Sequence, residues 1–278
     1  MATFIPLRPR IGAEAQVTRE EMLDPAFAGS CLAALEKHGV LLFPQVHLTD
    51  EQQVEFSSHL GKVIPQGPKR ADGTREIVFK ITLDQKENNA AEYLKSTVHW
   101  HIDGLFDETP PPRATLLSGR RLSPTGGQTE FCNVYAAYED LSEADRRACD
   151  SLRIMHSLEA SNRVWNPGAS EEERTRWRNH RKPKEHPLVW KHASGRKSLV
   201  LGMTVDYVVG MPAAGSAALV ERLTAHTTRP ENVYRHEWSV GDLLIWDNCG
   251  VMHRALPYDP TSGRMMHRTV LDGIEAIT

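Results

Sequence analysis

The pattern of apolar and polar positions changes near residue 77 of this 278-residue chain. Beyond that point the apolar stretches are short, and glycine, proline and aspartate separate them. Short apolar stretches bounded by turn-forming residues are typical of β-strands. We expect strands at residues 76–83, 114–118, 128–133, 188–190, 198–201, 233–238, 243–246 and 265–271. Many short strands at modest spacing predict a sandwich or barrel as the core of the fold.

The first sixty residues have a different pattern, which predicts helices packed around one strand. Asp24 and Pro25 have the residue types that begin a helix, and Gly39 is of the type that ends one. Residues 39–43 are continuously apolar and predict a buried strand. That strand should stop at Pro44, because proline has no backbone N–H to donate to a neighbouring strand.

A second helix should begin at Thr49. Thr49 and Gln52 have the spacing of a capping box, and the helix should end at Gly61. Further helices are expected at residues 142–153, 170–177 and 216–225. The whole chain, residues 1–278, is therefore predicted to be one α+β domain in which helices flank a β core.

Composition and charge exclude several classes of protein. Hydrophobic residues make up 40% of the chain and charged residues 25%, as in an ordinary soluble domain. A net charge of -3 gives no reason to expect nucleic acid as a partner. No apolar run approaches the roughly 18 residues of a membrane span, and the N-terminus does not resemble a secretory signal. We expect a cytoplasmic protein that binds neither membrane nor nucleic acid.

The cysteines and the polar stretches narrow the prediction further. The four cysteines are far apart and form no CxxC pair, which argues against a disulfide framework and against a cysteine-built zinc site. Residues 84–96 and 161–185 are two long polar stretches, the second strongly charged. Both are expected to be solvated surface segments. The first precedes the most chemically distinctive residues of the chain and is a candidate lid.

A candidate metal site combines two distant segments. His101 and Asp103 are two residues apart, so in a strand their side chains share a face. His253 is the best candidate for a third ligand. Two histidines and one carboxylate form the facial triad of non-haem Fe(II) oxygenases. The histidine–aspartate pair alone is weak evidence in a chain with 13 histidines, and ordinary polar residues explain such pairs more often.

Two arginines follow the third candidate ligand. Arg264 and Arg268 are four residues apart, so in a strand they share a face and lie about 13 Å apart at roughly 3.3 Å per residue. Arginine binds carboxylates in a two-pronged manner, and two such groups suggest two different anionic ligands. A solvated charged strand face explains the spacing equally well. His267, at odd spacing from both arginines, should face away from them.

Taken together, these segments resemble a known family. The chain is similar to the Fe(II)/2-oxoglutarate dioxygenases of the taurine dioxygenase family over residues 30–272, with matching segments in the same order and spacing. The segments are residues 38–44, His101-x-Asp103, Gly126-Gly127-Gln128-Thr129, Trp246-Asp247-Asn248, His253-Arg254-Ala255, and Arg264 with Arg268.

The resemblance implies a fold, an iron site and an activity. The fold would be a double-stranded β-helix, or jelly roll, with flanking helices. His101, Asp103 and His253 would bind Fe(II). The enzyme would use O₂ to hydroxylate a C–H bond of a small anionic substrate, such as a carboxylate, an amino or fatty acid derivative, or a sulfonate. It would convert 2-oxoglutarate to succinate and CO₂, and we expect it to be a homo-oligomer.

The resemblance also assigns three further residues. Arg264 would bind the distal carboxylate of 2-oxoglutarate, and Thr129 would donate a hydroxyl to it. Arg268 would meet the acidic head group of the substrate. Apart from the resemblance, we expect Gly104 and His99 to contact the substrate, because both lie beside the candidate ligands in the sequence.

Two alternatives come from other classes of protein. A cupin-like, non-oxidative isomerase or lyase would use His99 and His101 as a metal-binding pair and would not need Arg264. A jelly-roll protein that only binds a small molecule would need no iron.

Overall fold

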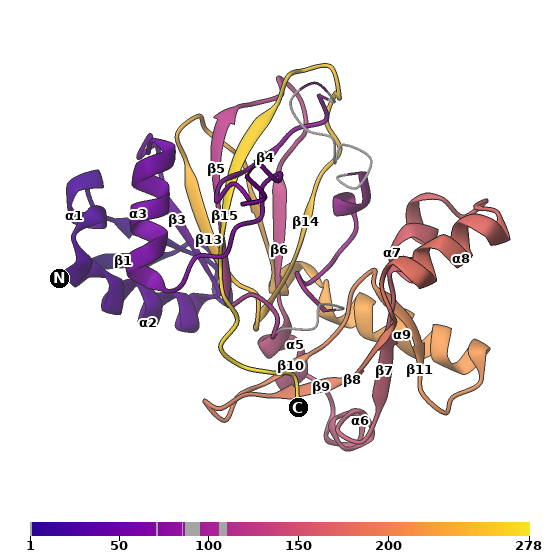
Figure 1. Ribbon diagram of the computed structural model, residues 1–278. Coiled ribbons are helices and arrows are strands. Elements are labelled where there is room, and N and C mark those ends of the chain that lie inside the picture. Colours follow the sequence, from indigo (N-terminus) through magenta and orange to yellow (C-terminus); the bar gives the residue numbers. More distant parts are fainter. Residues whose placement is uncertain (1, 71, 85, 87–94, 106–109) are drawn as a thin grey trace.

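The computed structural model describes residues 2–70, 72–84, 86, 95–105 and 110–278 (Figure 1). Its largest feature is a seven-stranded sheet. In spatial order the strands are β1 (Thr3–Pro6), β2 (Ala13–Gln16), β3 (Val40–Phe43), β13 (Leu243–Asp247), β5 (Ala114–Arg121), β15 (Met265–Leu271) and β4 (Phe79–Ile81). All neighbouring pairs are antiparallel except β2 and β3, which are parallel.

Among the described residues there are also three smaller antiparallel sheets. They are β12 (Val233–His236), β6 (Thr129–Asn133) and β14 (Val251–Ala255); β11 (Val205–Val208), β7 (Arg153–His156) and β8 (Lys184–Pro187); and β10 (Lys197–Leu199) with β9 (Val189–Lys191). The first of these faces the large sheet in Figure 1 and carries two of the segments identified from the sequence.

Helices cover the outer face of the large sheet and the far side of the small ones (Figure 1). The α-helices are α1 (Arg19–Leu23), α2 (Ala28–His38), α3 (Asp50–Leu60), α5 (Val134–Glu139), α6 (Glu143–Cys149), α7 (Leu158–Trp165), α8 (Glu171–His180) and α9 (Ala213–Thr227). Short 3₁₀ turns are η1 (Pro25–Phe27), η2 (Lys95–Val98) and η3 (Pro230–Asn232). The protein is thus a mixed helix and sheet structure.

Both faces of the large sheet are buried, which explains why β3 is continuously apolar. Leu41 and Phe43 pack on one face with Phe56 of α3, in the core that the N-terminal helices cover. Val40 and Leu42 point to the other face and pack in a second core. That second core includes residues of β6 and β14, so it lies between the large sheet and the sheet that faces it.

The predicted helix ends in the N-terminal region are confirmed. Asp24 caps a 3₁₀ turn that leads directly into α2, and Gly39 ends α2 with a φ of 71°. The Thr49 side chain accepts from the backbone of Gln52, and the Gln52 side chain accepts from the backbone of Thr49. The predicted capping box therefore begins α3.

The prediction of a single strand in the first sixty residues is wrong, because β1 and β2 also form there. These two strands are short. β1 has an exposed burial pattern with one partly buried residue at Phe4, so it shows no run of alternating buried apolar positions. A strand at the edge of a sheet is held by backbone pairing as much as by its side chains, and pairing is not visible in sequence periodicity.

The charged segment at residues 161–185 is helical over most of its length rather than a surface loop, and the helix predicted at residues 170–177 is confirmed. It contains most of α7 and all of α8. Ser170 and Glu173 form a capping box at the start of α8, and Arg178 of α8 pairs with Glu159 of α7 at 2.8 Å. The other polar segment, residues 84–96, falls almost entirely outside the described residues, so the lid stays a prediction.

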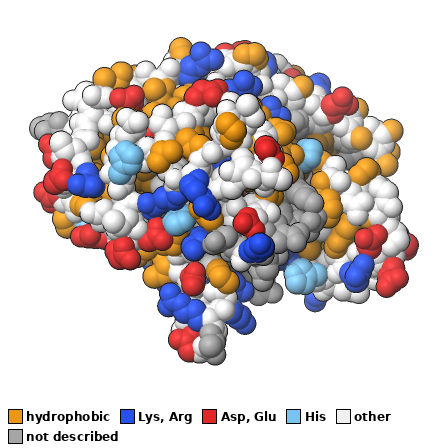
Figure 2. Space-filling model, turned by 90° about the horizontal axis from the view of Figure 1, so that it is seen from above, with side chains coloured by type: hydrophobic (Ala, Val, Ile, Leu, Met, Phe, Trp, Pro, Cys, Tyr) orange, Lys and Arg blue, Asp and Glu red, His pale blue; other side chains and the backbone are white. Residues whose placement is uncertain are grey.

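The surface seen in Figure 2 carries intermixed acidic and basic side chains, in keeping with a net charge of -3. Within the part of the chain that the structure describes, no helix is both long and apolar enough to cross a membrane.

Replacing Thr49 with alanine tests how much the capping box of α3 contributes to stability. This helix packs against β15, the strand that carries Arg268. Thr49→Ala should lower the free energy of unfolding by about 1 kcal/mol, because the backbone N–H of Gln52 loses its acceptor. Urea denaturation measures this change. Ser58→Ala, an exposed serine in the same helix, is the control and should change stability by less than about 0.5 kcal/mol. Equal effects of both variants would contradict a capping role.

Candidate metal centre

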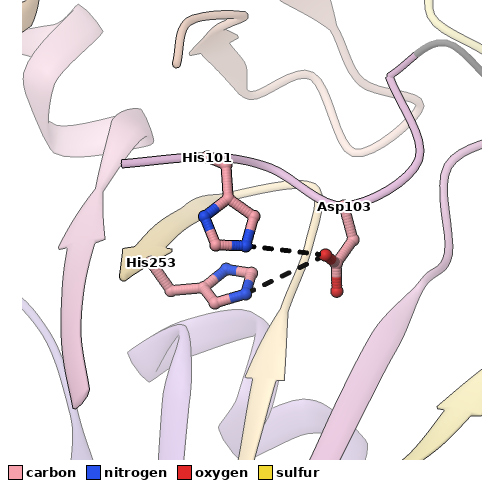
Figure 3. A group of neighbouring side chains, drawn as sticks. All are labelled: His101, Asp103 and His253. Atoms are coloured by element: carbon pink, nitrogen blue, oxygen red, sulfur yellow. Dashed lines mark ion pairs between the residues drawn. The ribbon is translucent and has the colours of Figure 1, made fainter. Parts of the chain in front are cut away.

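Three side chains that are distant in the sequence converge on one point. The ligand atoms of His101, Asp103 and His253 all lie within 4.8 Å of one another. Asp103 Oδ1 is 3.9 Å from His101 Nε2 and 4.0 Å from His253 Nε2. Figure 3 shows both rings presenting a nitrogen to the carboxylate. A divalent metal lies about 2.0–2.2 Å from such ligands, which puts the ligand atoms around one ion roughly 3 to 4.4 Å apart. The spacing therefore fits a single ion.

Backbone pairing holds the two histidines together. His101 and His253 form an isolated antiparallel bridge, with N···O distances of 3.0 Å and 2.9 Å in the two directions. Their ring centroids are 4.2 Å apart. His253 belongs to β14, which pairs with β6, so the position of His253 is fixed by a sheet. His101 gains a fixed position by pairing with it.

The strand geometry assumed for His101 and Asp103 does not form. Only His101 pairs, and Asp103 lies in a turn in which Gly104 has a φ of 79°. A positive φ is easy for glycine and costly for other residues. The turn, rather than the alternation of a strand, brings the carboxylate of Asp103 back toward the two imidazoles.

Burial sets the charge states of the group. Burial lowers the pKa of His253 to about 3, so its imidazole is neutral at pH 7. Burial alone would raise the pKa of Asp103, but His253, Arg268, His101 and a hydrogen bond from Thr115 together lower it. The cluster therefore offers neutral nitrogen at His253 and anionic oxygen at Asp103, as metal ligands require.

The remaining nitrogen of His101 has a backbone partner. His101 Nδ1 lies 2.8 Å from the carbonyl oxygen of His99, to which it can donate. Such a bond fixes the tautomer and leaves Nε2 free to bind a metal. The side chain of His99 does not belong to the three-residue group. His99 thus supports the candidate site through its backbone.

Two residues beside the site, Thr115 and Asn248, were given no role by the sequence, although Asn248 belongs to one of the matching segments. Thr115 Oγ1 donates to Asp103 Oδ2 at 3.2 Å, and Asn248 Nδ2 donates to Thr115 Oγ1 at 3.0 Å. Thr115 is fully buried in an otherwise apolar part of β5. A threonine within an apolar strand could have indicated a buried hydrogen bond. Its partner, Asp103, can be identified only from the folded structure.

On the face of β14 opposite the His253 side chain, charged side chains pack against one another. Arg254 follows His253 and lies with its guanidinium 4.6 Å from the centre of the Trp100 ring. Its Nε donates to Glu130 Oε2 at 2.7 Å. Glu130 also accepts from Arg235 at 2.8 Å, so this carboxylate is paired on both sides. The contacts link the segment before His101 to β14.

Of the two predicted arginines, Arg268 lies in β15 and Arg264 lies just before it. Arg264 is buried and donates through Nη2 to the carbonyl of Gly127 at 3.1 Å. Arg268 lies near the candidate ligands, since its charge acts on both Asp103 and His253. Arg268 Nε is buried without a hydrogen-bond partner among the described residues. His267 contacts Asp50 of α3 at 2.6 Å, on the other side of the sheet, which confirms that it faces away.

Gly127 contacts Arg264, and Thr129 follows it two residues later at the start of β6. Thr129 Oγ1 accepts from Trp238 Nε1 at 3.0 Å, so its own O–H can still donate. A Cβ atom at Gly127 would come within 2.9 Å of Arg264 Nε, and the φ of Gly127 is 78°. Glycine is therefore required here both by space and by conformation. Arg264 is therefore positioned by its contact with the segment at residues 126–129.

Comparison with known proteins places this geometry in context. The family model described as "Taurine catabolism dioxygenase TauD, TfdA family" matches residues 3–270. The "Alpha-ketoglutarate-dependent 2,4-dichlorophenoxyacetate dioxygenase" of Burkholderia sp. (strain RASC) is 32% identical over 275 residues, which cover 95% of this chain and 91% of the relative. The "Alpha-ketoglutarate-dependent sulfate ester dioxygenase" of Pseudomonas putida is 35% identical over 280 residues, covering 96% and 88%.

A solved structure shows a similar fold. AAD-2 in complex with Mn(II) and N-oxalylglycine has a TM-score of 0.82 and 28% sequence identity, with 100% of both chains covered. A putative alpha-ketoglutarate-dependent taurine dioxygenase from Burkholderia xenovorans has a TM-score of 0.80 and 29% identity, covering 99% of this chain and 93% of that one.

Single substitutions test whether the three converging residues form the metal site. His101→Ala, Asp103→Ala and His253→Ala should each abolish binding of Mn(II) at concentrations that saturate the unaltered protein, because a three-residue site has no spare donor. Anaerobic titration followed by electron paramagnetic resonance measures free Mn(II). His99→Ala is the matched control and should keep the metal, since its contact with His101 is made by the backbone. Metal loss in that control with retained binding by His253→Ala would contradict the assignment.

Proposed function

Because the chain belongs to the TauD, TfdA family, it is a 2-oxoglutarate-dependent dioxygenase, and we propose that His101, Asp103 and His253 hold its Fe(II). The bound metal supplies the oxidative chemistry, which couples hydroxylation of a C–H bond in a small anionic substrate to conversion of 2-oxoglutarate and O₂ to succinate and CO₂. Family membership decides against the cupin-like isomerase or lyase and against a pure binding protein.

The donor set supports the assignment of the three ligands. Two imidazole nitrogens and one carboxylate oxygen are the facial triad used by non-haem Fe(II) oxygenases, and the triad leaves positions open for other ligands. Asp103 Oδ1 is the oxygen that faces both imidazoles, at 3.9 Å and 4.0 Å. The sheet-bound backbone bridge between His101 and His253 would keep the two nitrogens in place before the metal binds.

Arg264 and Thr129 are proposed to bind the distal carboxylate of 2-oxoglutarate. The Arg264 guanidinium is buried, donates through Nη2 to the Gly127 carbonyl and also interacts with Tyr258. A guanidinium has five N–H donors, so further N–H groups are left for a ligand. Burial strengthens a charge-assisted bond because water cannot compete for it. The Thr129 hydroxyl, held by Trp238, would donate to the same carboxylate.

Arg268 is proposed to bind the acidic group of the primary substrate. The observation that carries this proposal is the buried Nε of Arg268, which has no hydrogen-bond partner among the described residues, on a side chain whose charge acts on Asp103. An unsatisfied buried guanidinium N–H is costly, and an anionic ligand would satisfy it. Such a contact would also fix which carbon of the substrate faces the metal. His99 and Gly104 stay predictions as further substrate contacts.

The substrate class can be narrowed through the relatives. The relatives are named for their action on a chlorinated phenoxyacetate, a sulfate ester and a phenoxypropionate. These molecules share an anionic group near a carbon that carries an ether or ester oxygen. We propose an aryloxyalkanoate or alkyl sulfate as the substrate. Hydroxylation of a carbon that bears such an oxygen gives a product that can fragment.

The finer architecture is also a proposal. The large sheet and the β12–β6–β14 sheet face each other across a shared core, as expected of a double-stranded β-helix. We propose that residues 1–278 form one such domain with helices at its sides. A homo-oligomeric state stays a prediction.

The function is tested first by absorbance and then by product formation. Under anaerobic conditions, Fe(II) and 2-oxoglutarate together should produce a visible charge-transfer band that neither gives alone. In air, a panel of aryloxyalkanoates, alkyl sulfates, sulfonates and N-substituted amino acids should reveal at least one compound that stimulates succinate formation. Absence of the band from metal-loaded protein would contradict the proposed site. Stimulation by sulfonates or amino acids alone would contradict the substrate class.

Separate substitution of the two arginines tests their different roles. Arg264→Ala should weaken 2-oxoglutarate binding roughly 10- to 150-fold, the loss expected for a charge-assisted bond of about 1.5–3 kcal/mol. Arg268→Ala should bind 2-oxoglutarate almost as before, but should form succinate without a matching amount of oxidised substrate. Succinate and oxidised product are measured side by side. Arg235→Ala, whose guanidinium pairs with Glu130 on the outer face, is the control and should change neither. An equal loss of 2-oxoglutarate binding in both test variants would refute the division of roles.

A further inference from the structure

The carboxylate of Asp103 has two oxygens in different surroundings. Oδ1 faces the Nε2 atoms of His101 and His253, at 3.9 Å and 4.0 Å. Oδ2 accepts a hydrogen bond from Thr115 Oγ1 at 3.2 Å. One oxygen is thus directed toward the candidate metal position, while the other is bonded to the protein.

The direction of the Thr115 hydrogen bond is fixed by its other neighbour. Asn248 Nδ2 donates to Thr115 Oγ1 at 3.0 Å. A hydroxyl has a single proton, so when it accepts from an amide its own proton is available for a second partner. Asp103 Oδ2, an ionised carboxylate oxygen, can only accept. The hydrogen bonds therefore run in one direction, from Asn248 through Thr115 to Asp103.

We call this chain of hydrogen bonds, from Asn248 through Thr115 to Asp103, the relay. Its position is rigid. Thr115 and Asn248 are both fully buried, so bulk water cannot compete for their hydrogen bonds. Thr115 lies in the middle of the large sheet, paired with Trp246 on one side and Val270 on the other. A β-branched side chain in a strand has restricted χ1 rotamers. The hydroxyl therefore cannot readily move with the carboxylate if Asp103 rotates.

We propose that Thr115 and Asn248 are positioning residues that keep Asp103 a one-oxygen ligand. This inference rests on the proposed role of Asp103 as a metal ligand. A carboxylate can bind a metal through one oxygen or through both. Two-oxygen binding would occupy an additional position, whereas the facial triad functions because positions remain open for 2-oxoglutarate and O₂. By engaging Oδ2, Thr115 would keep this additional position available to 2-oxoglutarate and O₂.

Variants at Thr115 test the proposal without changing the size of the side chain. Thr115→Val removes the hydroxyl and keeps the shape, and Thr115→Ser keeps the hydroxyl. Anaerobic titrations measure two dissociation constants, first that of Mn(II) or Fe(II) and then that of 2-oxoglutarate or N-oxalylglycine for the metal-loaded protein. Thr115→Val should keep metal binding within a few-fold but weaken 2-oxoglutarate binding about tenfold, and Thr115→Ser should restore it.

Thr269→Val is the matched control. Thr269 is a fully buried threonine on the adjacent strand β15, but its hydroxyl bonds to Ser57 of α3 on the opposite face of the sheet. Its loss should lower stability similarly and leave both dissociation constants unchanged. Thermal denaturation of every variant separates misfolding from the specific effect.

A change at Asn248 tests the direction of the relay. Asn248→Asp replaces a donor with an acceptor, so the Thr115 proton would turn toward residue 248 and away from Asp103. In folded protein this variant should resemble Thr115→Val in its affinity for 2-oxoglutarate. An affinity equal to that of the unaltered protein would overturn the proposed direction.

The outcomes separate this inference from the proposed function. If the unaltered protein binds no divalent metal, the ligand assignment itself fails. If it binds metal and 2-oxoglutarate, and Thr115→Val behaves like Thr269→Val, the ligand assignment stands and the positioning role is overturned. Complete loss of metal from well-folded Thr115→Val would also overturn the one-oxygen proposal, because Thr115 would then be needed for binding the metal at all.

Discussion

The backbone bridge between His101 and His253 is the constraint on which the rest of the site depends. Its two hydrogen bonds, of 3.0 Å and 2.9 Å, attach an otherwise irregular segment to the edge of β14. On one side of this pairing, the His253 ring packs against Trp246. On the other side, Arg254 lies against Trp100 and is held by Glu130. The imidazoles are therefore fixed by contacts from both faces, and Asp103 needs only one turn to reach them.

The two facing sheets contribute different parts of the proposed chemistry. The β12–β6–β14 sheet supplies His253 and Thr129, while the large sheet supplies Thr115, with Arg268 in β15 and Arg264 just before it. The apolar core between the sheets keeps water away from these polar groups, which strengthens each charge-assisted contact. A charged group in this setting is favourable only with a partner. The guanidinium of Arg264 is buried, and within the described ranges the Nε of Arg268 has no hydrogen-bond partner; both features are consistent with a site that binds anions.

The sequence was sufficient to predict those elements that depend on residues close together in the chain. Capping residues such as Thr49 and Gln52, and the apolar run that became β3, specify their structures through neighbouring positions. The family resemblance identified three residues that the folded chain brings together, although the strand expected around His101 is a bridge followed by a turn. The contacts from Thr115 and Asn248 could not be predicted, because they join residues 12 and 133 positions apart and depend on strand pairing. β1 and β2 were missed for the same reason.

The most direct test of this account is a crystal structure determined anaerobically with Fe(II) and 2-oxoglutarate. We expect one iron bound by Nε2 of His101, Nε2 of His253 and a single oxygen, Oδ1, of Asp103, with Oδ2 still bonded to Thr115. Iron bound by the His99 ring, or by both oxygens of Asp103, would contradict it.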